Sequence, residues 1–391
     1  MIVFQRLKIL FLLTILLLLG TTSAFATEFA VGTCKPSLSS FSSISAAVST
    51  VPPGSTVLVC PGTYAEQVTI SQPLTLEGIA IGNSDQVIIA VPSTGLSPNA
   101  MGLGGTSVAA QVLVTAGPVN ITNITVDGTG NTVDTFLTSL AGIFYDSGSS
   151  GVLNQVVARD QADLASPSVP GTGVGIWVQN GNTTSESVTI ENCSVHDFNS
   201  MGIFVETNQS PSTLNATVRG NSVDATNATA SVFGIAILSG GVITSNTITG
   251  PGAGSFNAQG LTGQNGSFTA SINVITNWES AIVDFNAGTY TNNTIRETSV
   301  GFAFNTSGAT VNSNTIAHVA ISGIEFNCNT GTVRGNTIDD AETGLNDVPG
   351  SQNSTNNFFN VVTIRNDGCS DASSGLSKGA AAHTPKRVPR T

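Results

Sequence analysis

The sequence predicts an all-β protein built as a parallel β-helix, a solenoid of stacked coils. Between residues 289 and 347 one unit is written three times: an Asn, an apolar residue two positions later, a polar turn, then Gly-apolar-x-apolar. The Asn positions Asn293, Asn314 and Asn336 are 21 and 22 residues apart. A unit with two short strands cannot bury its own apolar face, so successive units must stack.

The unit continues toward both ends of the chain. Stacking would place equivalent residues about 4.8 Å apart. Buried Asn side chains at this spacing can hydrogen bond along the stack, so we expect an Asn ladder beside rows of apolar residues. Cys193 takes the ladder position in its own unit. The predicted column comprises Asn154, Asn221, Asn246, Asn273, Asn293, Asn314, Asn336 and Asn357.

The first 26 residues have the features of a secretory signal. Arg6 and Lys8 precede an apolar run, and Ala24-Phe25-Ala26 is a small-x-small cleavage site. The alternative is an anchoring helix, but the run is short for a membrane span of about 20 residues. We therefore expect no membrane span after cleavage, and a protein that is secreted, periplasmic or on the cell surface.

One elongated domain is predicted over residues 27–369, because repeat arrays grow in one direction. An amphipathic helix over about 41–51 is expected to cap the open N-terminal end of the stack. Residues 370–391 are small and polar, then basic, without an apolar period, and are predicted to form a disordered tail.

Export permits disulfide bonds between the five cysteines. Cys34 and Cys60 flank the predicted helix and are expected to pair. Cys193 lies in the inward Asn column, which favours a buried free thiol. A bond between Cys328 and Cys369 is an open alternative.

The segment from Gly54 to Gly78, GSTVLVCPGTYAEQVTISQPLTLEG, resembles the opening of the right-handed parallel β-helix proteins of the pectin-lyase-like superfamily. The later N-T-I and G-I-x-V units are similar to the repeats of that superfamily. Periodicity alone leaves the handedness open, whereas the resemblance, over about residues 35–365, implies a right-handed coil and association with carbohydrate. It implies no single reaction, because the superfamily includes lyases, hydrolases, esterases, epimerases, tailspikes, adhesins and non-enzymes.

Three longer connections interrupt the period, at residues 159–172, 179–187 and 206–216. Insertions in a solenoid emerge on its faces and commonly form its binding surface.

An aromatic row is predicted on the coils that carry these connections. In Gly-apolar-x-apolar the residue x faces outward, which gives Phe144, Trp177 and Phe204 on successive coils. An exposed row would offer flat apolar faces to sugar rings, with Asp160 and Glu206 as polar contacts. The alternative is that the loops fold over the rings and bury them.

Acidic and histidine residues near these loops are compatible with calcium, which prefers carboxylate and carbonyl oxygens. The chain has no fixed-spacing calcium loop, and no motif requires a cofactor. The residues in question are Asp160, Asp163, Glu186, Glu191, His196, Asp197 and Glu206.

A second column lies four residues after the Asn positions and gives the candidate catalytic residues Glu297, His318 and Asp340. The two carboxylates would be about 10 Å apart across two coils, just beyond the span of about 6.5–9.5 Å in inverting glycosidases. A histidine between them could act as a base or a ligand. The alternative is a solvated turn in which charge has no function.

Enzyme signatures of the superfamily are incomplete. Val283-Asp284-Phe285 resembles a fragment of the pectin methylesterase strand that carries the nucleophilic Asp, but the rest of that motif is missing, and the repeat places Asp284 at a core position. The polygalacturonase and pectate-lyase motifs are also absent. Three histidines leave little room for a multi-His metal site.

The first functional hypothesis is therefore an exported, monomeric protein that binds an extracellular polysaccharide. A polysaccharide lyase or glycoside hydrolase, and a structural or adhesive surface protein, are the alternatives. The net charge of −12 argues against nucleic acid as a partner.

Overall fold

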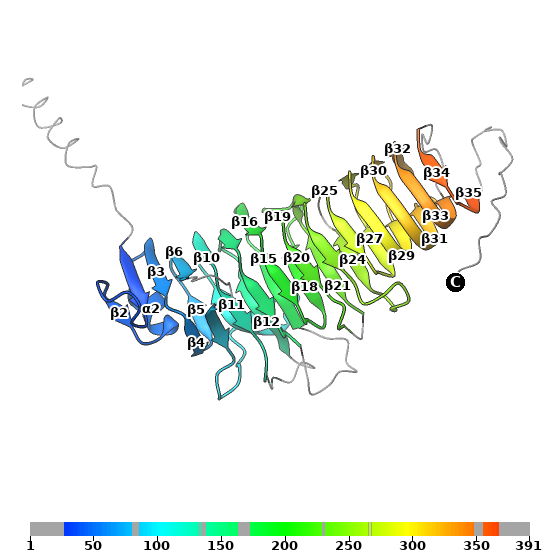
Figure 1. Cartoon of the computed structure of the whole chain (residues 1–391). Helices are drawn as coiled ribbons and strands as arrows, with labels where there is room; N and C mark the ends of the chain where they lie inside the picture. Colours follow the sequence, from blue (N-terminus) through cyan, green and yellow to red (C-terminus); the bar gives the residue numbers. More distant parts are fainter. Residues whose placement is uncertain are drawn as a thin grey trace, which may run out of the picture.

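The computed structural model describes residues 27–79, 86–131, 133, 138–162, 173–228, 231–264, 266, 268–347 and 355–366. They form one elongated parallel β-helix (Figure 1). The predicted signal segment, residues 1–26, and the predicted tail, residues 370–391, lie outside the described residues. Within the described part of the chain no helix has the length and apolar character to cross a membrane.

The first sheet contains 13 strands, all in parallel register. In spatial order they are β2 (Ser40–Phe41), β1 (Glu28–Val31), β3 (Ser55–Val59), β6 (Leu74–Gly78), β10 (Val119–Thr122), β13 (Gly151–Asn154), β16 (Glu186–Glu191), β19 (Leu214–Arg219), β22 (Gly240–Thr244), β25 (Phe268–Ser271), β28 (Thr289–Thr291), β30 (Ala309–Asn312) and β32 (Gly331–Arg334).

The second sheet contains 22 strands arranged in two rows. The corner row comprises β4 (Gly62–Ala65), β7 (Val87–Ala90), β11 (Thr125–Asp127), β14 (Val157–Arg159), β17 (Ser194–His196), β20 (Ser222–Asp224), β23 (Thr247–Thr249), β26 (Val274–Thr276) and β34 (Asn357–Phe359). The wall row comprises β5 (Val68–Ile70), β9 (Ser107–Val114), β12 (Thr138–Tyr145), β15 (Gly173–Asn180), β18 (Met201–Thr207), β21 (Phe233–Leu238), β24 (Gln259–Gly263), β27 (Ser280–Asp284) and β35 (Thr363–Asn366), with β8 (Ala100–Met101) antiparallel to β9.

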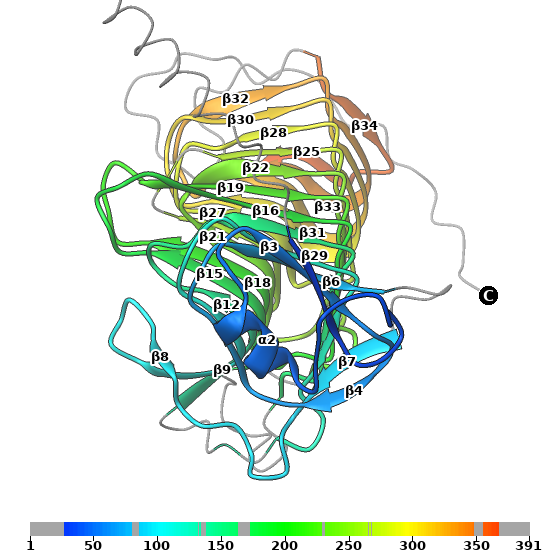
Figure 2. The same ribbon diagram turned by 90° about the vertical axis from the view of Figure 1, so that its left-hand side faces the viewer.

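Three long strands join the two rows near the C-terminal end. These strands, β29 (Thr294–Phe304), β31 (Thr315–Glu325) and β33 (Thr337–Asn346), run around the corner with irregular register at the bend. Each full coil thus follows a first-sheet strand, a corner strand and a wall strand. The view along the axis in Figure 2 shows these coils stacked behind one another.

The interior is a set of apolar rows, as the repeat predicts. One row runs through the first sheet with every member buried, because alternate side chains of each strand point inward and stacked strands share their register. Its members are Val57, Leu76, Ile121, Leu153, Ile190, Val218, Ile243, Ala270, Tyr290, Val311 and Val333.

The predicted Asn ladder is present at the bend between the first sheet and the corner row. Each Asn Nδ2 donates to the Oδ1 of the next Asn at 2.9 Å, from Asn221 through to Asn336. Each Nδ2 also donates to a backbone carbonyl of the preceding coil, such as Ala270 O for Asn293 at 3.0 Å. Each Oδ1 further accepts the backbone N–H of the preceding Asn, which satisfies these buried amide groups.

The two terminal members of the predicted column are wrong. The last rung is Asn356, whose Oδ1 accepts from Asn336 Nδ2 at 3.0 Å, and Asn357 instead begins the next strand. At the other end the equivalent residue is Val156, because Val157 pairs with Ser194, the residue after Cys193. Asn154 ends strand β13 and bonds Asn192 on the outside. Asn154 lies two residues before the ladder position, and its spacing to an apolar residue matches the repeat only by chance.

Helix α2 (Ile44–Thr50) is shorter than the predicted 41–51 segment. It begins after Ser43, whose Oγ accepts from Ala46 N at 3.1 Å. The Glu66 carboxylate accepts from Ile44 N at 2.9 Å and Ser45 N at 2.8 Å, which satisfies two further donors of the first turn.

The predicted helical cap is not supported. The edge of the first sheet is strand β2, which pairs with β1, so a strand and not the helix ends this sheet. The helix instead packs its buried residues Ile44, Ala47 and Val48 against the main core.

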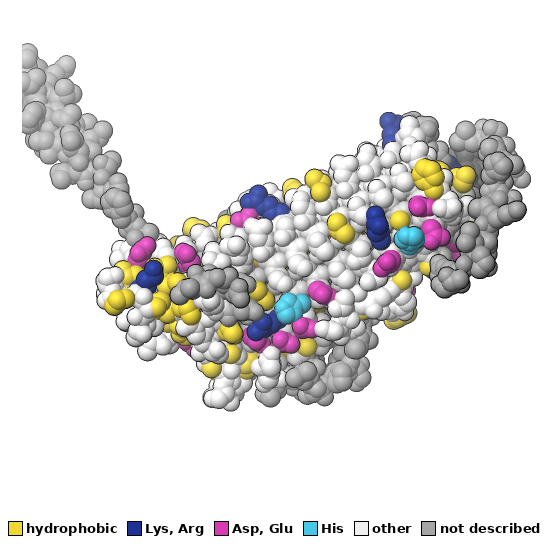
Figure 3. Space-filling view, viewed as in Figure 1, with side chains coloured by type: hydrophobic (Ala, Val, Ile, Leu, Met, Phe, Trp, Pro, Cys, Tyr) yellow, Lys and Arg dark blue, Asp and Glu magenta, His cyan; other side chains and the backbone are white. Residues whose placement is uncertain are grey.

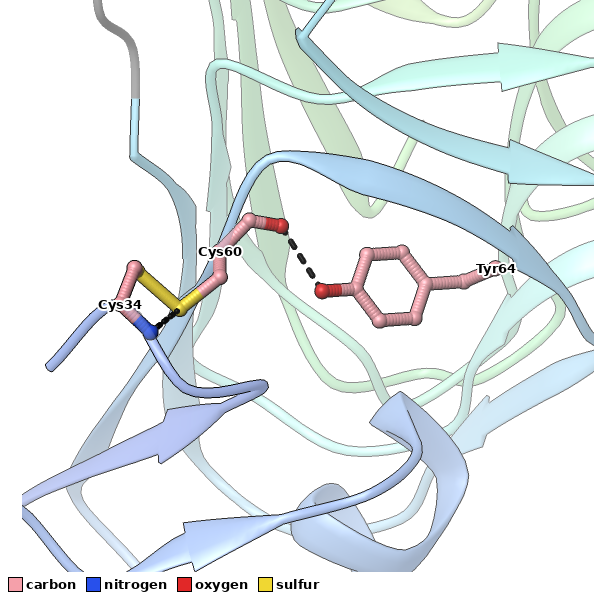
Figure 4. Close-up of a disulfide and its surroundings, with 3 residues drawn as sticks. All are labelled: Cys34, Cys60 and Tyr64. Carbon is pink, nitrogen blue, oxygen red and sulfur yellow. Dashed lines mark hydrogen bonds between the residues drawn. A yellow bond between two sulfur atoms is a disulfide. The ribbon is translucent and has the colours of Figure 1, made fainter. Parts of the chain in front are cut away.

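The predicted Cys34–Cys60 disulfide is present (Figure 4) and links the residues after β1 to the end of β3. Tyr64 Oη donates to Cys60 O at 2.8 Å and packs beside the bond. The predicted alternative pairing of Cys328 with Cys369 involves Cys369, which lies outside the residues that the structure describes.

Cys193 is buried and free, as predicted. Its Sγ lies 3.3 Å from Glu191 O inside the core. Burial raises the pKa of the Cys193 thiol to about 12. The column therefore changes along the stack from Val156, through the thiol, to the Asn ladder.

Replacing Asn293 by Ala should destabilise the protein. The change leaves the buried donors of Asn273 without their acceptor and Ala270 O without its donor, and a buried unsatisfied group costs about 1–3 kcal/mol. Urea unfolding followed by circular dichroism measures the effect. Asn215→Ala, the same change at an exposed strand position, should stay within about 0.5 kcal/mol of the parent. Equal midpoints for both variants would contradict a stabilising ladder.

Cys193 should resist alkylation in the folded protein, because the thiolate is the reactive form and burial suppresses it. Iodoacetamide labelling followed by peptide mapping should modify Cys193 only after denaturation. Rapid labelling of the native protein at neutral pH would show that the core around this residue opens.

Candidate functional site

The turn column predicted four residues after the ladder exists, and backbone conformation explains its polar character. At the bend between corner and wall rows one residue adopts positive φ on most coils, a conformation in which Asn and Asp are enriched. These residues are Asp160 (56°), Asp197 (55°), Asn277 (64°), Glu297 (55°), His318 (55°), Asp340 (54°) and Asn360 (51°).

Charged side chains gather in two separate groups along this side of the β-helix, each with one histidine (Figure 3). The group toward the C-terminal end, here the distal corner, consists of Glu297, His318 and Asp340. His318 Nδ1 lies 2.9 Å from Asp340 Oδ2, and these side chains are 56% and 50% exposed. Glu297 is also exposed on the adjacent coil. Two of the three predicted catalytic residues therefore meet, in an open turn.

The other group, here the acidic corner, consists of Asp127, Arg159, Asp160, His196 and Asp197. Asp127, Arg159 and His196 end successive corner strands in direct register. Arg159 Nε donates to Asp127 Oδ2 at 2.9 Å and lies 3.9 Å from Asp160 Oδ2. His196 Nδ1 lies 2.6 Å from Asp197 Oδ2. The arrangement fixes three carboxylates, one guanidinium and one imidazole on neighbouring coils.

The acidic corner is less exposed than the distal corner. Side-chain exposure is 16% for Asp127, 23% for Arg159 and 31% for Asp197, although Asp160 reaches 40%. Partial burial strengthens the interactions among these charges, because water screens them less.

Two carboxyl groups of the acidic corner have pKa values shifted in opposite directions. Burial, and then the negative charges of Asp127 and Asp197, raise the pKa of Asp160. Burial alone would also raise the pKa of Asp197, but hydrogen bonds from Asn227 (2.7 Å) and His196 lower it below its usual value. Asp160 therefore stays protonated to higher pH than Asp197 does, and such a difference is typical of an acid paired with an ionised carboxylate. The two residues lie on adjacent coils, whose backbones are about 4.8 Å apart.

The aromatic row lies outside the wall, as predicted, but it does not form an exposed platform. Phe144, Trp177 and Phe204 are 0%, 6% and 8% exposed. Their ring centroids are 5.0 and 5.3 Å apart, and they form an apolar cluster separate from the main core. The rings are buried, as in the alternative, but the described residues that pack over them include a connection that the sequence did not predict to lie there. Gly102 and Ala100, in the connection 91–106, lie against Trp177 and the ring cluster.

A polar row lies beside the rings. Gln179 Nε2 donates to Asp146 Oδ1 at 2.6 Å, and Trp177 Nε1 donates to Glu206 Oε1 at 3.0 Å. Burial raises the pKa of Glu206, although the bond from Trp177 opposes the shift. The predicted ligand residue Glu206 therefore belongs to the covered aromatic face, whereas Asp160 belongs to the acidic corner.

The residues considered for calcium do not form one group: Asp160, His196 and Asp197 lie in the acidic corner, and the others lie elsewhere or outside the described residues. Glu191 ends β16 in the first sheet and is paired with Arg219, and Glu186 accepts from Gly148 N at 2.7 Å. Asp163 lies outside the described residues. Among the residues that the structure describes, no group of three or more His, Cys, Asp or Glu side chains is arranged to hold a metal ion.

Asp284 is a buried turn residue. Its carboxylate accepts from Asn286 N at 2.7 Å and Gly288 N at 3.0 Å, and it has no exposed surface. Burial raises its pKa. The partial likeness to a methylesterase nucleophile therefore has no counterpart here, because a substrate cannot reach this carboxylate.

Sequence reasoning missed Asp127 and Arg159. Each ends a corner strand in the place that His196 occupies one coil later. The sequence contained a signal for them. In each unit an apolar residue lies two positions after the ladder residue, and the residue directly after that apolar residue falls on one outward row. Reading that row would have found Asp127, Arg159, His196 and Asp224 together.

No protein-family model matches the chain, and no curated protein matches it. Solved structures do. A GH136 lacto-N-biosidase from Eubacterium ramulus is similar with a TM-score of 0.60 and 11% identity, over 85% of this chain and 68% of that one. The periplasmic alginate epimerase AlgG (TM-score 0.49, 12% identity, 82% and 83%) and the pectin methylesterase PemA from Erwinia chrysanthemi (0.44, 12%, 67% and 80%) are also similar. This chain has the right-handed parallel β-helix fold.

Proposed function

We propose that this protein is an exported, monomeric protein that binds an extracellular carbohydrate at the acidic corner. The observation that carries the proposal is the fixed set of partly buried carboxylates held by Arg159, His196 and Asn227 on adjacent coils. Carboxylate oxygens accept hydrogen bonds from sugar hydroxyls, and guanidinium and imidazole groups donate to them. A neutral polysaccharide suits this acidic surface better than a polyanion does, unless calcium bridges the two.

The fold supports this proposal, because a protein named as a lacto-N-biosidase has a similar structure. The distal corner is the alternative binding site. If neither corner binds a sugar, a structural or adhesive role is the remaining hypothesis.

Glycoside hydrolysis is a second candidate function, favoured by the opposite pKa shifts of Asp160 and Asp197. Retaining glycosidases use two carboxyl groups about 5–5.5 Å apart, and Asp160 and Asp197 come from adjacent coils whose backbones are about 4.8 Å apart. Asp160 would donate its proton to the leaving oxygen while Asp197 attacks the anomeric carbon and forms an ester with the sugar. Water would then attack this ester, give its proton to the Asp160 carboxylate, and release the sugar and the Asp197 carboxylate.

Binding should depend on the acidic corner. Asp160→Asn and Asp197→Asn should each weaken binding of a glycan-array hit about 10- to 100-fold, the value of a hydrogen bond to a charged group. Isothermal titration calorimetry, with and without calcium, measures the change. Asp340→Asn is the matched control, because it alters the same kind of turn residue at the distal corner.

The outcome separates the two corners. Loss of binding with Asp340→Asn alone would move the site to Glu297, His318 and Asp340. Absence of any binding across a broad array would leave the adhesive or structural role.

Hydrolysis should show a bell-shaped pH profile. Activity needs Asp160 protonated, and its raised pKa keeps it so to higher pH; it needs Asp197 ionised, and its lowered pKa keeps it so to lower pH. The release of new reducing ends from a polysaccharide panel, measured against pH, tests this. Activity that survives in Asp197→Asn, or that rises steadily with pH, would exclude the assignment.

A further inference from the structure

Among the described residues, one hairpin lies over the aromatic row; it is here called the strap, residues 91–106. It leaves the corner row after β7, forms β8 and returns into β9, where Ala100 pairs with Val108 and Met101 with Ser107. A Cβ on Gly102 would lie 3.0 Å from Trp177 Cη2, so the strap backbone rests directly on the indole. The strap therefore covers Trp177 from outside the coil and packs Ala100 against the ring cluster.

The strap is firmly attached at its base. Asn99 Nδ2 donates to Ala110 O at 3.0 Å, and Asn99 Oδ1 accepts from Ala110 N at 2.9 Å. Gln67 exchanges hydrogen bonds with the backbone of Ser97 at 2.7 and 3.0 Å. These contacts fix the base next to β9.

The far end of the strap is held by two polar side chains of the wall, Gln179 and Glu206. Gln179 Nε2 donates to Met101 O at 2.9 Å, and Gln179 Oε1 accepts from Leu103 N at 3.0 Å. The Glu206 carboxylate also accepts a hydrogen bond from the Leu103 backbone. Beyond Leu103, a Cβ on Gly104 or Gly105 would have almost no neighbour, so the tip is unpacked. The strap thus has a fixed base, a Gln179 latch supported by Glu206, and an open tip.

Beneath the strap lies a surface with the chemistry of a sugar site. The three rings are continuous, and outward side chains at the ends of the same strands, Asp146, Gln179 and Glu206, edge them with amide and carboxylate groups. Apolar ring faces beside a few polar groups are typical of small-ligand sites.

We propose that the strap is an autoinhibitory cover over a second carbohydrate subsite, formed by Phe144, Trp177 and Phe204 with Asp146 and Glu206. Release of the Gln179 latch uncovers the rings, which then stack on a neutral oligosaccharide. Because the aromatic cluster is separate from the main core, opening leaves the coil intact. The inference rests on the proposed carbohydrate binding and assigns it a regulated extension.

Trp177 fluorescence in the full-length protein tests the release. The chain has two tryptophans, and Trp278 is fully buried in the core, so acrylamide quenching that changes on opening reports Trp177. Gln179→Ala should raise the quenching constant several-fold, and oligosaccharide from a neutral gluco-, galacto-, xylo- and manno-series panel should lower it again. Gln264→Ala, a change at an exposed glutamine after β24, three coils from Trp177, should match the parent.

A reversible lock keeps the test independent of folding defects. Leu103 Cδ2 lies 2.8 Å from a Cβ built on Gly181, so Leu103→Cys with Gly181→Cys should form a disulfide that holds the strap closed. Oxidation should abolish oligosaccharide-dependent protection of Trp177, and reduction should restore it, with the parent protein treated identically as the control.

Three results would overturn the proposal: unchanged quenching in Gln179→Ala, quenching that rises without oligosaccharide binding, or binding unaffected by the lock. If Asp160→Asn abolishes binding while the latch and lock variants behave like the parent, the acidic-corner site stands and the strap inference fails. If latch release creates binding that Asp160→Asn leaves unchanged, the strap subsite stands without the acidic corner.

Discussion

The structure depends on the hydrogen bonding of buried Asn side chains at one bend of the coil. Each amide bonds the next Asn above it, the backbone N–H of its neighbour and a carbonyl of the preceding coil. The residue before each Asn takes positive φ at most bends, as at Ser245, Asn292 and Ser313, so the chain turns sharply while the amide points inward. A shift of one residue would leave several of these buried groups unpaired, so the ladder fixes the register of the strands on either side.

Fixed register has a chemical consequence on the outside of the coil. Side chains at equivalent positions of neighbouring coils lie in rows. Similar residues on successive coils therefore form a continuous surface that lengthens by about 4.8 Å with each coil. The acidic corner is one such group, in which Asp127, Arg159 and His196 share a row and Asp160 and Asp197 share the next bend. The aromatic face is another. Neither surface needs backbone geometry beyond that of the repeat itself.

The repeat could be predicted from sequence because its spacing is nearly constant between Asn273 and Asn336. Where the spacing lengthens, the ladder position could not be assigned by counting residues. Asn154 was predicted to be a ladder residue, although Val156 occupies that position. The rings at Phe144, Trp177 and Phe204 were placed outside the wall correctly, since strand alternation decides the side. Their burial could not be predicted, because the strap has no periodic signal and its latch joins residues 76 and 78 positions apart in the chain.

The two charged corners show why a turn column alone does not define a site. Asp160 and Asp197, like His318 and Asp340, occupy the same left-handed bend, and that conformation by itself favours polar residues. What differs is the row beside each bend. At the acidic corner it supplies Asp127, Arg159 and His196, which pair with one another or with the turn carboxylates. At the distal corner the same row reads Arg296, Ala317 and Asp339, and His318 and Asp340 meet in largely open solvent. Screening by water weakens charge interactions at an exposed turn, whereas partial burial preserves them and separates the pKa values of neighbouring acids. The neighbouring row, and not the turn column itself, therefore distinguishes the acidic corner from the distal corner.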